Sequence, residues 1–224
     1  MSKTTVISVA NAKGGVGKST VTMLLASALA KQKKKKVLIL DTDSQESISI
    51  WLKSEQRNYE TDALVTVEAL APNHVQMFLK KFGEDYDFVF IDIPRMTNSL
   101  NEATNIQVLY YCDVILIPAI GSRLDVMSTS RFFKIVQDAA KKKKELGFDF
   151  KVLGFLNRET NRRDNQEAKE ILAKNMNIPM MEASLRELKL FTSPSLFESI
   201  LDTKEGRDRF EPFFNEFCKQ LKIK

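Results

Sequence analysis

Short, continuously apolar segments alternate with helical patterns along most of the chain. The predicted strands span residues 4–10, 37–40, 88–91, 114–117 and 151–156. These segments lack the alternation of apolar and polar residues that marks a strand with one solvent-exposed face. We therefore predict that both faces of each strand are covered. Strands that alternate with helices predict an α/β fold, with a mostly parallel β-sheet flanked by helices on both faces.

Apolar residues at helical spacing mark two of the intervening helices. One stripe comprises Val21, Leu24, Leu25, Ala28 and Leu29, and the other comprises Phe132, Phe133, Ile135, Val136 and Ala139. Lysine runs at residues 33–36 and 141–144 each follow a helical pattern. Because cations are favourable at a helix C-terminus, we predict that both runs are solvated helix ends. Residues 53–63 are polar and are predicted to form a surface excursion.

The length of 224 residues predicts one domain, residues 1–224, with a sizeable core. No apolar run reaches the roughly 18 residues of a membrane span, and no leader precedes the first strand, so we expect a cytoplasmic protein. Cys112 and Cys218 form no CxxC pair and are expected to be reduced. The net charge of +5 comes from 34 basic and 29 acidic residues, which permits contact with an anionic polymer without establishing it.

A glycine-rich segment follows the first predicted strand and precedes the first helix. It reads Lys13-Gly14-Gly15-Val16-Gly17-Lys18-Ser19-Thr20. In an open parallel sheet ligands bind beyond the carboxyl ends of the strands, and this context separates a phosphate loop from a chance glycine cluster. Glycines allow close backbone approach, so N–H groups of the turn can converge on phosphate oxygens. We expect Lys18 to contact the β- and γ-phosphates and the Ser19 hydroxyl to bind Mg²⁺.

Carboxylates stand at the ends of two later predicted strands. One strand ends in Leu40-Asp41-Thr42-Asp43, and the next ends in Ile91-Asp92. Carboxylates beside a triphosphate would be repelled unless a metal ion is present, and Mg²⁺ prefers oxygen ligands and retained waters. The sequence therefore predicts a magnesium site at this edge of the sheet.

The loop resembles the deviant Walker A loop of the ParA/MinD superfamily of dimerising ATPases. The strict pattern GxxxxGK[ST] would place glycine at position 12, where this chain has Ala12, and the second lysine, Lys13, opens the loop instead. The DxD segment and the apolar run that ends in Asp92 are similar to the family's pattern, whereas Ser44 and Arg95 stand where the family usually has proline. The resemblance runs to about residue 202 and implies a single P-loop ATPase domain.

The resemblance also implies a role for each polar group. Asp43 would orient or activate the attacking water, and Asp41 and Asp92 would hold Mg²⁺ through its waters. Lys13 would reach across an ATP-bound homodimer to the partner's phosphates, where positive charge stabilises the transition state. Hydrolysis would then depend on dimerisation, so we expect a slow, Mg-dependent ATPase that acts as a switch.

The late part of the chain favours adenine over guanine. The segment Asn157-Arg158-Glu159-Thr160 lacks the carboxylate of the guanine-reading motif Asn-Lys-x-Asp. Asn157 instead resembles the ParA-type adenine contact. Residues 185–195, which include Pro194, resemble the family segment that closes over the base. ATP is therefore the expected nucleotide.

The first functional hypothesis is DNA segregation by a small, nucleoid-associated ParA-type partition ATPase. The resemblance implies that ATP-bound dimers bind DNA without sequence preference and that a centromere-binding ParB-type adaptor stimulates hydrolysis. No DNA-reading domain is expected before the loop, which begins at residue 13. Late basic residues are the candidate DNA contacts, because phosphate contacts dominate non-specific binding. They are Arg158, Arg162, Arg163, Arg186 and Lys189.

The alternative is a MinD-like positioning ATPase that binds a membrane through its last helix. Phe210, Phe213, Phe214, Phe217 and Leu221 form a helical stripe flanked by lysines. The same stripe suits the buried face of a helix that packs on the sheet, with Pro212 near its start, and we favour this interpretation over membrane binding. A metabolic enzyme is disfavoured because no further domain or catalytic Cys/His pair is visible, and the absence of CxxC argues against an iron–sulfur protein.

Overall fold

The computed structural model describes residues 4–95, 102–121, 123–160, 163–175 and 177–224. Six strands form one parallel sheet in the order β3-β2-β4-β1-β5-β6. The strands are β1 (Thr5–Val9), β2 (Val37–Asp41), β3 (Thr66–Ala69), β4 (Phe88–Asp92), β5 (Val114–Ala119) and β6 (Lys151–Leu156). The α-helices are α1 (Lys18–Lys33), α2 (Ser47–Glu55), α3 (Val75–Phe82), α4 (Glu102–Leu109), α5 (Arg123–Glu145), α6 (Arg163–Glu170) and α7 (Lys204–Leu221).

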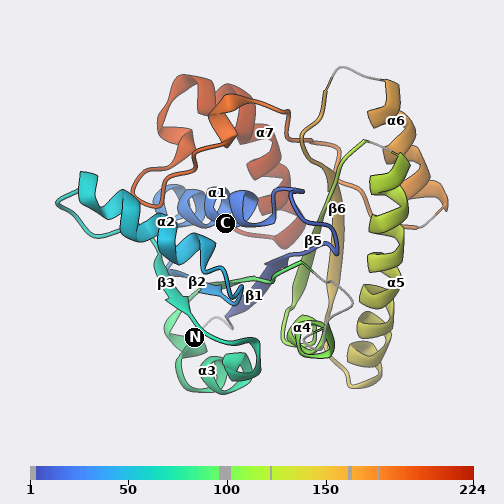
Figure 1. Ribbon diagram of the computed structural model, residues 1–224, viewed down its shortest axis with the longest axis horizontal. Coiled ribbons are helices and arrows are strands. Elements are labelled where there is room, and N and C mark those ends of the chain that lie inside the picture. Colours follow the sequence, from blue (N-terminus) through green and yellow to red (C-terminus); the bar gives the residue numbers. More distant parts are fainter. Residues whose placement is uncertain (1–3, 96–101, 122, 161–162, 176) are drawn as a thin grey trace.

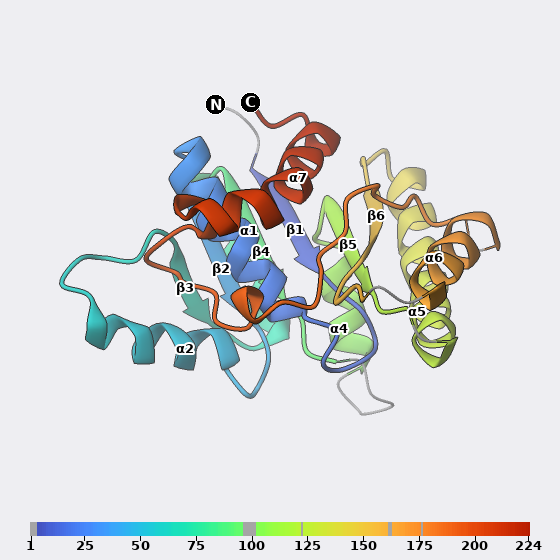
Figure 2. The ribbon, with the colours of Figure 1, turned by 90° about the horizontal axis from the view of Figure 1, so that it is seen from above.

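Helices cover both faces of the sheet. The core on one face is formed with α1 and α7, and the core on the other with α3, α4, α5 and α6 (Figure 1). Figure 2 shows the strand arrows running toward the end of the molecule that carries α2 and α4. The α/β prediction is confirmed, and all five predicted strands are present within a few residues of their predicted bounds.

The sequence pattern did not predict β3, α2, α3, α4 or α6 individually, and β3 and α2 show why. β3 pairs with β2 at the edge of the sheet, but three of its four side chains are exposed, so it has no continuous apolar run. α2 overlaps the predicted surface excursion at residues 53–63, whose first three residues complete the helix; none of residues 53–63 is buried. Only Ile48 and Ser49 of α2 are buried, which explains its weak signal.

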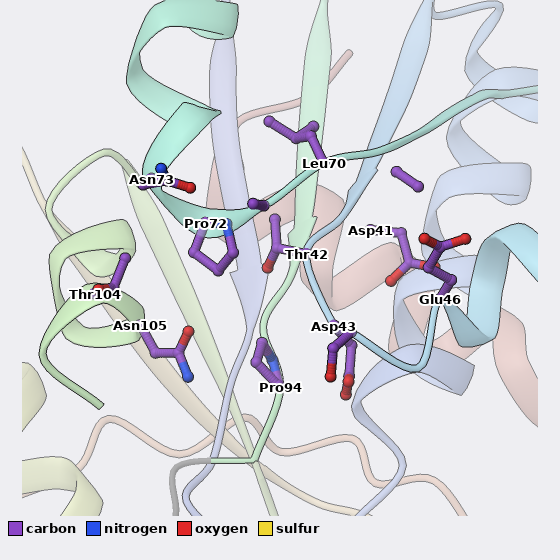
Figure 3. Close-up of a pocket in the computed structure, with 13 residues that line it drawn as sticks. Asp41, Thr42, Asp43, Glu46, Leu70, Pro72, Asn73, Pro94, Thr104 and Asn105 are labelled. Atoms are coloured by element: carbon purple, nitrogen blue, oxygen red, sulfur yellow. The ribbon is translucent and has the colours of Figure 1, made fainter. Parts of the chain in front are cut away.

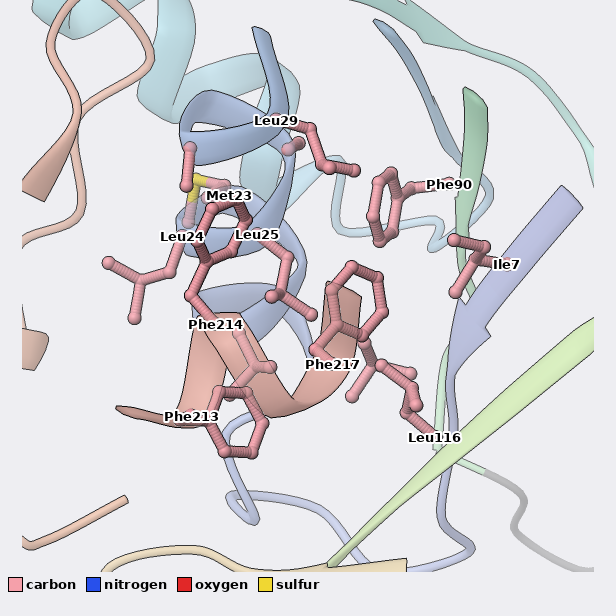
Figure 4. Packing of buried hydrophobic residues seen from close by; sticks show 14 of the residues in the cluster. Ile7, Met23, Leu24, Leu25, Leu29, Phe90, Leu116, Phe213, Phe214 and Phe217 are labelled. Carbon is pink, nitrogen blue, oxygen red and sulfur yellow. The ribbon is translucent and has the colours of Figure 1, made fainter. Parts of the chain in front are cut away.

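The C-terminal phenylalanine stripe belongs to the core. Phe210, Phe213, Phe214 and Phe217 are each at most 2% exposed. Figure 4 shows Phe213, Phe214 and Phe217 beside α1 and the sheet. The buried-face interpretation is therefore confirmed. Within the described ranges, no helix is long and apolar enough to cross a bilayer.

Two local predictions are wrong. Pro212 lies in the interior of α7, because the helix begins two turns earlier, where the Thr203 hydroxyl accepts a 2.9 Å hydrogen bond from Gly206 N. Lys143, in the second lysine run, is buried and not solvated. Its ammonium group donates to Cys112 O and lies 5.2 Å from the centre of the Phe150 ring. This lysine thus satisfies a buried carbonyl at the start of β5.

The carboxyl ends of β2 and β4 are tied together, which fixes the edge where the acidic residues lie. Asp41 and Asp92 are paired across the two strands. Thr42 then donates to Asp92 O twice, from its backbone N at 3.1 Å and from its hydroxyl at 2.7 Å. The two strand ends therefore present their side chains as one unit beside the loop that follows β1.

Candidate functional site

The loop between β1 and α1 meets the N-terminus of α1 at Gly17. This residue has φ +91°, and a Cβ there would come within 2.3 Å of Asn157 Nδ2, so only glycine fits. No side chain caps α1 and no acidic residue lies in its first turn. The first amides of α1 are therefore suited to an anionic ligand, which the helix dipole also favours.

Two buried asparagines hold this loop in place. Asn11 donates to Pro118 O at 2.8 Å, and its own Oδ1 accepts from Lys13 N at 3.2 Å. Asn157, after β6, donates to Val16 O at 2.7 Å. Asn11 was not predicted, because its sequence neighbours give no sign of the contact with β5. The described contact of the Asn157 side chain is with the loop, which does not test its predicted contact with adenine. That contact stays a prediction.

Lys18 and Ser19 stand at the junction of the loop with α1. Lys18 is half-buried, and its ammonium group donates to Lys13 O at 3.2 Å. Burial lowers the pKa of Lys18, while the nearby negative charges of Asp92 and Asp43 act in the opposite direction. The Ser19 hydroxyl donates a 2.6 Å hydrogen bond to Asp92 Oδ2. A cation and a hydroxyl thus lie beside two carboxylates at the end of the sheet.

Asp92 is a buried carboxylate whose negative charge is poorly compensated. It is 1% exposed, and its Oδ1 has no hydrogen-bond partner among the described residues. Burial raises the pKa of Asp92 to about 7, opposed by the Ser19 hydrogen bond and reinforced by the charge of Asp41. A carboxylate oxygen without a partner and a neighbouring hydroxyl are ligands that suit Mg²⁺. Ser19 and Asp92 therefore fit the predicted metal site.

The described residues contain no cluster of three or more His, Cys, Asp or Glu side chains that could enclose a metal ion.

Asp41 is turned toward α2. Its Oδ2 accepts hydrogen bonds of 3.0 Å from both Ile48 N and Ser49 N, and a carboxylate in this position stabilises a helix N-terminus. Its Oδ1 is buried and has no partner among the residues that the structure describes. Asp41 lies next to Asp92 across the strands, but its predicted part in holding Mg²⁺ is not tested by these contacts.

Asp43 lies on the loop that connects β2 to α2. Its Oδ1 accepts a 3.0 Å hydrogen bond from Gln45 N, and its carbonyl accepts from Glu46 N at 2.9 Å. These contacts form a tight turn around a half-buried carboxylate. The turn holds Asp43 near Lys18, where its negative charge opposes the lowering of the Lys18 pKa by burial.

A cavity of about 720 Å³ brings most of the predicted residues together. We call it the phosphate cavity. It is lined by Gly14, Gly15, Gly17, Lys18, Ser19, Thr20, Asp43, Ser44, Gln45, Ile93, Pro94, Arg95, Asn105 and Arg158. Its basic side chains are Lys18, Arg95 and Arg158, against one carboxylate, Asp43, which suits a polyanionic ligand.

Besides Asp41, Asp92 and Asn157, three further residues predicted for the nucleotide site lie outside this lining. Val16 is buried beneath the loop, and the side chain of Lys13 is exposed. Pro194 is buried, and its carbonyl accepts from Trp51 Nε1 of α2 at 2.9 Å. The exposure of Lys13 is compatible with a role outside its own cavity, and the roles of all three residues stay predictions.

Arg95 and Arg158 were not predicted as phosphate-cavity residues. The Arg95 side chain lies 3.4 Å from the position that a Cβ on Gly14 would take, so it covers the loop. The sequence signalled Arg95 only as a departure from a family proline. Arg158, predicted as a DNA contact, has φ +53° and lines the cavity.

The remaining candidate DNA contacts are less closely grouped. Arg186 and Lys189 are exposed, and an isolated bridge pairs Glu159 with Arg186. Arg162 lies outside the described residues. Arg163 is described only as the first residue of α6, without its side chain.

Comparison with known proteins gives a family match over most of the chain. The family model for the CobQ/CobB/MinD/ParA nucleotide binding domain matches residues 7–198. A curated relative, the maintenance of carboxysome distribution protein A of Halothiobacillus neapolitanus, is 27% identical over 217 residues, which cover 94% of each chain.

Solved structures share the fold at lower sequence identity. McdA of Cyanothece, in complex with ATP, aligns with a TM-score of 0.78 and 19% identity over 100% of this chain and 98% of that chain. A plasmid partition protein from Borrelia burgdorferi aligns with a TM-score of 0.67 and 20% identity over 98% of this chain and 100% of that one. At these identities, the structural likeness is evidence for the fold.

Proposed function

Because this chain belongs to the CobQ/CobB/MinD/ParA nucleotide-binding family, we propose that it is a Mg-ATP-dependent switch ATPase that partitions or positions a cargo. The observation that carries this proposal is the phosphate cavity. Its glycine loop and uncapped α1 terminus suit phosphates, and the Ser19–Asp92 pair suits a metal ion. The segregation and positioning proteins among its relatives favour this class of function.

Several groups in and beside the phosphate cavity have a part in the proposed reaction. Loop amides and the Lys18 ammonium group would bind the β- and γ-phosphates of ATP. Ser19 and Asp92 would hold Mg²⁺, which neutralises charge on the phosphate oxygens when it is bound. Asp43 would orient the attacking water, since it lines the same cavity as Lys18 and Ser19.

Dimerisation is proposed to complete the site. Lys13 is exposed and does not line the cavity of its own chain, so it would act on the phosphates of a second copy. Positive charge supplied in trans stabilises the transition state for phosphoryl transfer. The ATP state would then persist as a dimer until an adaptor stimulates hydrolysis.

We propose that DNA is the polymer to which the ATP-bound form of this switch binds. An ATP-bound homodimer would double a weak basic patch and so bind duplex DNA without sequence preference, with a ParB-type adaptor on the cargo. The carboxysome-distribution relative broadens the cargo from a replicon to a protein body. A nucleoid-associated location in the cytoplasm follows from this proposal.

Membrane positioning receives less support. The phenylalanine side chains that would have to enter a bilayer are packed between α7, α1 and the sheet. Exposing them would remove a large part of the apolar core on that face, at a cost of several kcal/mol for each aromatic side chain.

Co-sedimentation would test the proposal. The purified chain is mixed with non-specific duplex DNA and, in parallel, with anionic liposomes, each with Mg-ATP or Mg-ADP. We expect ATP-selective binding to DNA that weakens steeply with salt, and no binding to liposomes. ATP-selective binding to liposomes alone would overturn the DNA proposal.

Charge-reversal variants would locate the DNA surface. Arg162→Glu combined with Arg163→Glu is expected to weaken DNA binding and leave ATP binding intact. The control is Lys53→Glu with Arg57→Glu, which reverses two exposed charges near α2. Equal DNA affinity of the two double variants across a salt series would remove Arg162 and Arg163 from the proposed surface.

A further inference from the structure

A second cavity, of about 740 Å³, lies beside the phosphate cavity at the carboxyl ends of β2, β3 and β4. We call it the acidic cavity. It is lined by Asp41, Thr42, Asp43, Ser44, Glu46, Ala69, Leu70, Ala71, Pro72, Asn73, Pro94, Thr104 and Asn105. Figure 3 shows Asp41, Asp43 and Glu46 along one wall and Thr104 and Asn105 along the other, with Pro72 and Pro94 between them.

The two cavities have opposite charge. Three carboxylates and no lysine or arginine stand among the described residues that line the acidic cavity, whereas the phosphate cavity has three basic side chains and one carboxylate. The two cavities share Asp43, Ser44, Pro94 and Asn105 in their linings. A ligand for the acidic cavity should therefore be a cation, in contrast to the polyanion expected in the phosphate cavity.

Two buried acceptors in the walls are unsatisfied. Asp41 is 1% exposed and Asn105 is 4% exposed, and the Oδ1 of each has no hydrogen-bond partner within the described part of the chain. A buried acceptor without a partner is costly, and such groups are rare in folded proteins. Both point to a ligand that donates hydrogen bonds on both sides of the cavity.

A bare metal ion does not explain these features. The carboxylates do not form a group of three that could hold a metal within the described residues. Asp41 also uses its Oδ2 to accept from the amides of Ile48 and Ser49. A larger organic cation, with several donors spread over one plane, can reach acceptors on opposite walls.

The floor of the acidic cavity is apolar. Ala69 ends β3 and is followed by Leu70 and Ala71, and Pro72 and Pro94 lie between the polar walls. A linear aliphatic stem can lie on such a surface while its charged head meets the acids. A planar guanidinium has five N–H donors in a fixed fork that matches carboxylates, which a single ammonium group does not.

We propose that the acidic cavity binds an alkylguanidinium group, such as an arginine side chain, with its donors shared between the acidic wall and Asn105. The occupant would contact the loop that carries Asp43. If the proposed ATPase function holds, the ligand thereby gains direct access to the segment that orients water.

The test uses the full chain with Mg-ADP bound. Binding is followed by amide chemical shifts during titration with three acetylated, amidated tripeptides, Gly-Arg-Gly, Gly-citrulline-Gly and Gly-Lys-Gly, and with agmatine. Citrulline keeps the shape of arginine and lacks its charge. We expect shifts at Leu70, Ala71 and Asn105, and binding of the arginine peptide about tenfold tighter than that of the citrulline peptide.

Three variants sharpen the assignment. Asn105→Leu removes a buried acceptor and should weaken the arginine peptide about tenfold. Glu46→Gln removes an exposed charge on this cavity and should weaken it about threefold. Glu68→Gln makes the same charge change on β3, outside the lining, and should have no effect.

Several outcomes would overturn the proposal. They are equal binding of the arginine and citrulline peptides, a lysine peptide as tight as the arginine peptide, shifts confined to the phosphate cavity, or displacement of the peptide by added Mg²⁺. Agmatine binding as tight as the peptide supports a small alkylguanidine as the occupant, while binding of the peptide alone supports a segment of a partner protein. ADP affinity is measured in the same samples, so failure of the nucleotide site is seen separately.

Discussion

The Ser19 hydroxyl donates a 2.6 Å hydrogen bond to Asp92 Oδ2, and this contact joins the start of α1 to the end of β4. It satisfies one oxygen of a carboxylate that is 1% exposed, while the second oxygen has no partner among the described residues. The pair is therefore a site where burial disfavours the negative charge and a bound cation would favour it.

The first prediction concerns the stability of the nucleotide-free protein. Burial raises the pKa of Asp92 to about 7 from the ordinary 3.8, so the folded state holds this proton more tightly than the unfolded state. The contribution of the protonated group to stability is complete below about pH 4 and is lost as the pH rises through 7. In EDTA at pH 8, Asp92→Asn should therefore unfold at higher urea concentration than the wild type, with a gain on the order of 1–4 kcal/mol.

The advantage of Asp92→Asn should shrink when the same urea titration is run at pH 5. Asp85→Asn, at an exposed aspartate, serves as the control and should show no such pH dependence. With Mg²⁺ and ADP the order should reverse, because the cation favours the carboxylate. A constant difference between wild type and Asp92→Asn at both pH values would contradict the raised pKa.

The second prediction concerns Lys13. Lys13→Ala should retain nucleotide binding by the monomer, because Lys13 does not line its own phosphate cavity, but should lose hydrolysis and its coupling to dimerisation. A loss of roughly a hundredfold or more in turnover is expected for a charge that acts on the transition state. Turnover and sedimentation with ATP provide the measurement. Lys18→Ala is the contrasting variant and should lose nucleotide binding itself. Wild-type turnover in Lys13→Ala would eliminate action in trans.

The third prediction concerns Asp43. Asp43→Ala should bind ATP, dimerise and remain trapped as the ATP dimer, because the carboxylate proposed to orient the attacking water is absent. Size-exclusion chromatography with ATP and with ADP, together with phosphate release, would show the trapped state. Asp62→Ala, at an exposed aspartate outside both cavities, is the matched control. If Asp43→Ala stays monomeric with ATP, the proposed role of Asp43 is wrong.

The elements that the sequence predicted well are those whose signal is local. β2 and β4 are buried along their full length, so their apolar runs were visible without any tertiary information. The phosphate loop was visible for the same reason, since one short segment holds its glycines and both lysines. β3 was missed because it pairs on one edge only and exposes most of its side chains.

Features that depend on distant contacts were not predicted. The two asparagines that support the phosphate loop are residue 11 and residue 157, and their partners lie more than 100 positions away in sequence. In the sequence, Lys143 is indistinguishable from its solvated neighbours. In the fold, its ammonium group donates to Cys112 O. The acidic cavity combines four chain segments, and only its aspartates had attracted attention as strand-end carboxylates.

The last prediction distinguishes a core helix from a membrane anchor. Phe217 on α7 is 0% exposed, so Phe217→Ala should lower the free energy of unfolding by about 3–5 kcal/mol. The control is Phe148→Ala, which removes a phenyl ring from a residue that is 56% exposed. This variant should change the free energy of unfolding by no more than about 0.5 kcal/mol. Urea unfolding of the two variants gives the comparison, and deletion of residues 208–224 should prevent folding altogether. A membrane anchor would behave in the opposite way: Phe217→Ala would leave stability unchanged and abolish ATP-selective binding to anionic liposomes. Because the stripe packs against α1, which carries Lys18 and Ser19 at its first turn, loss of the α7 contact should also weaken ADP binding by the folded protein.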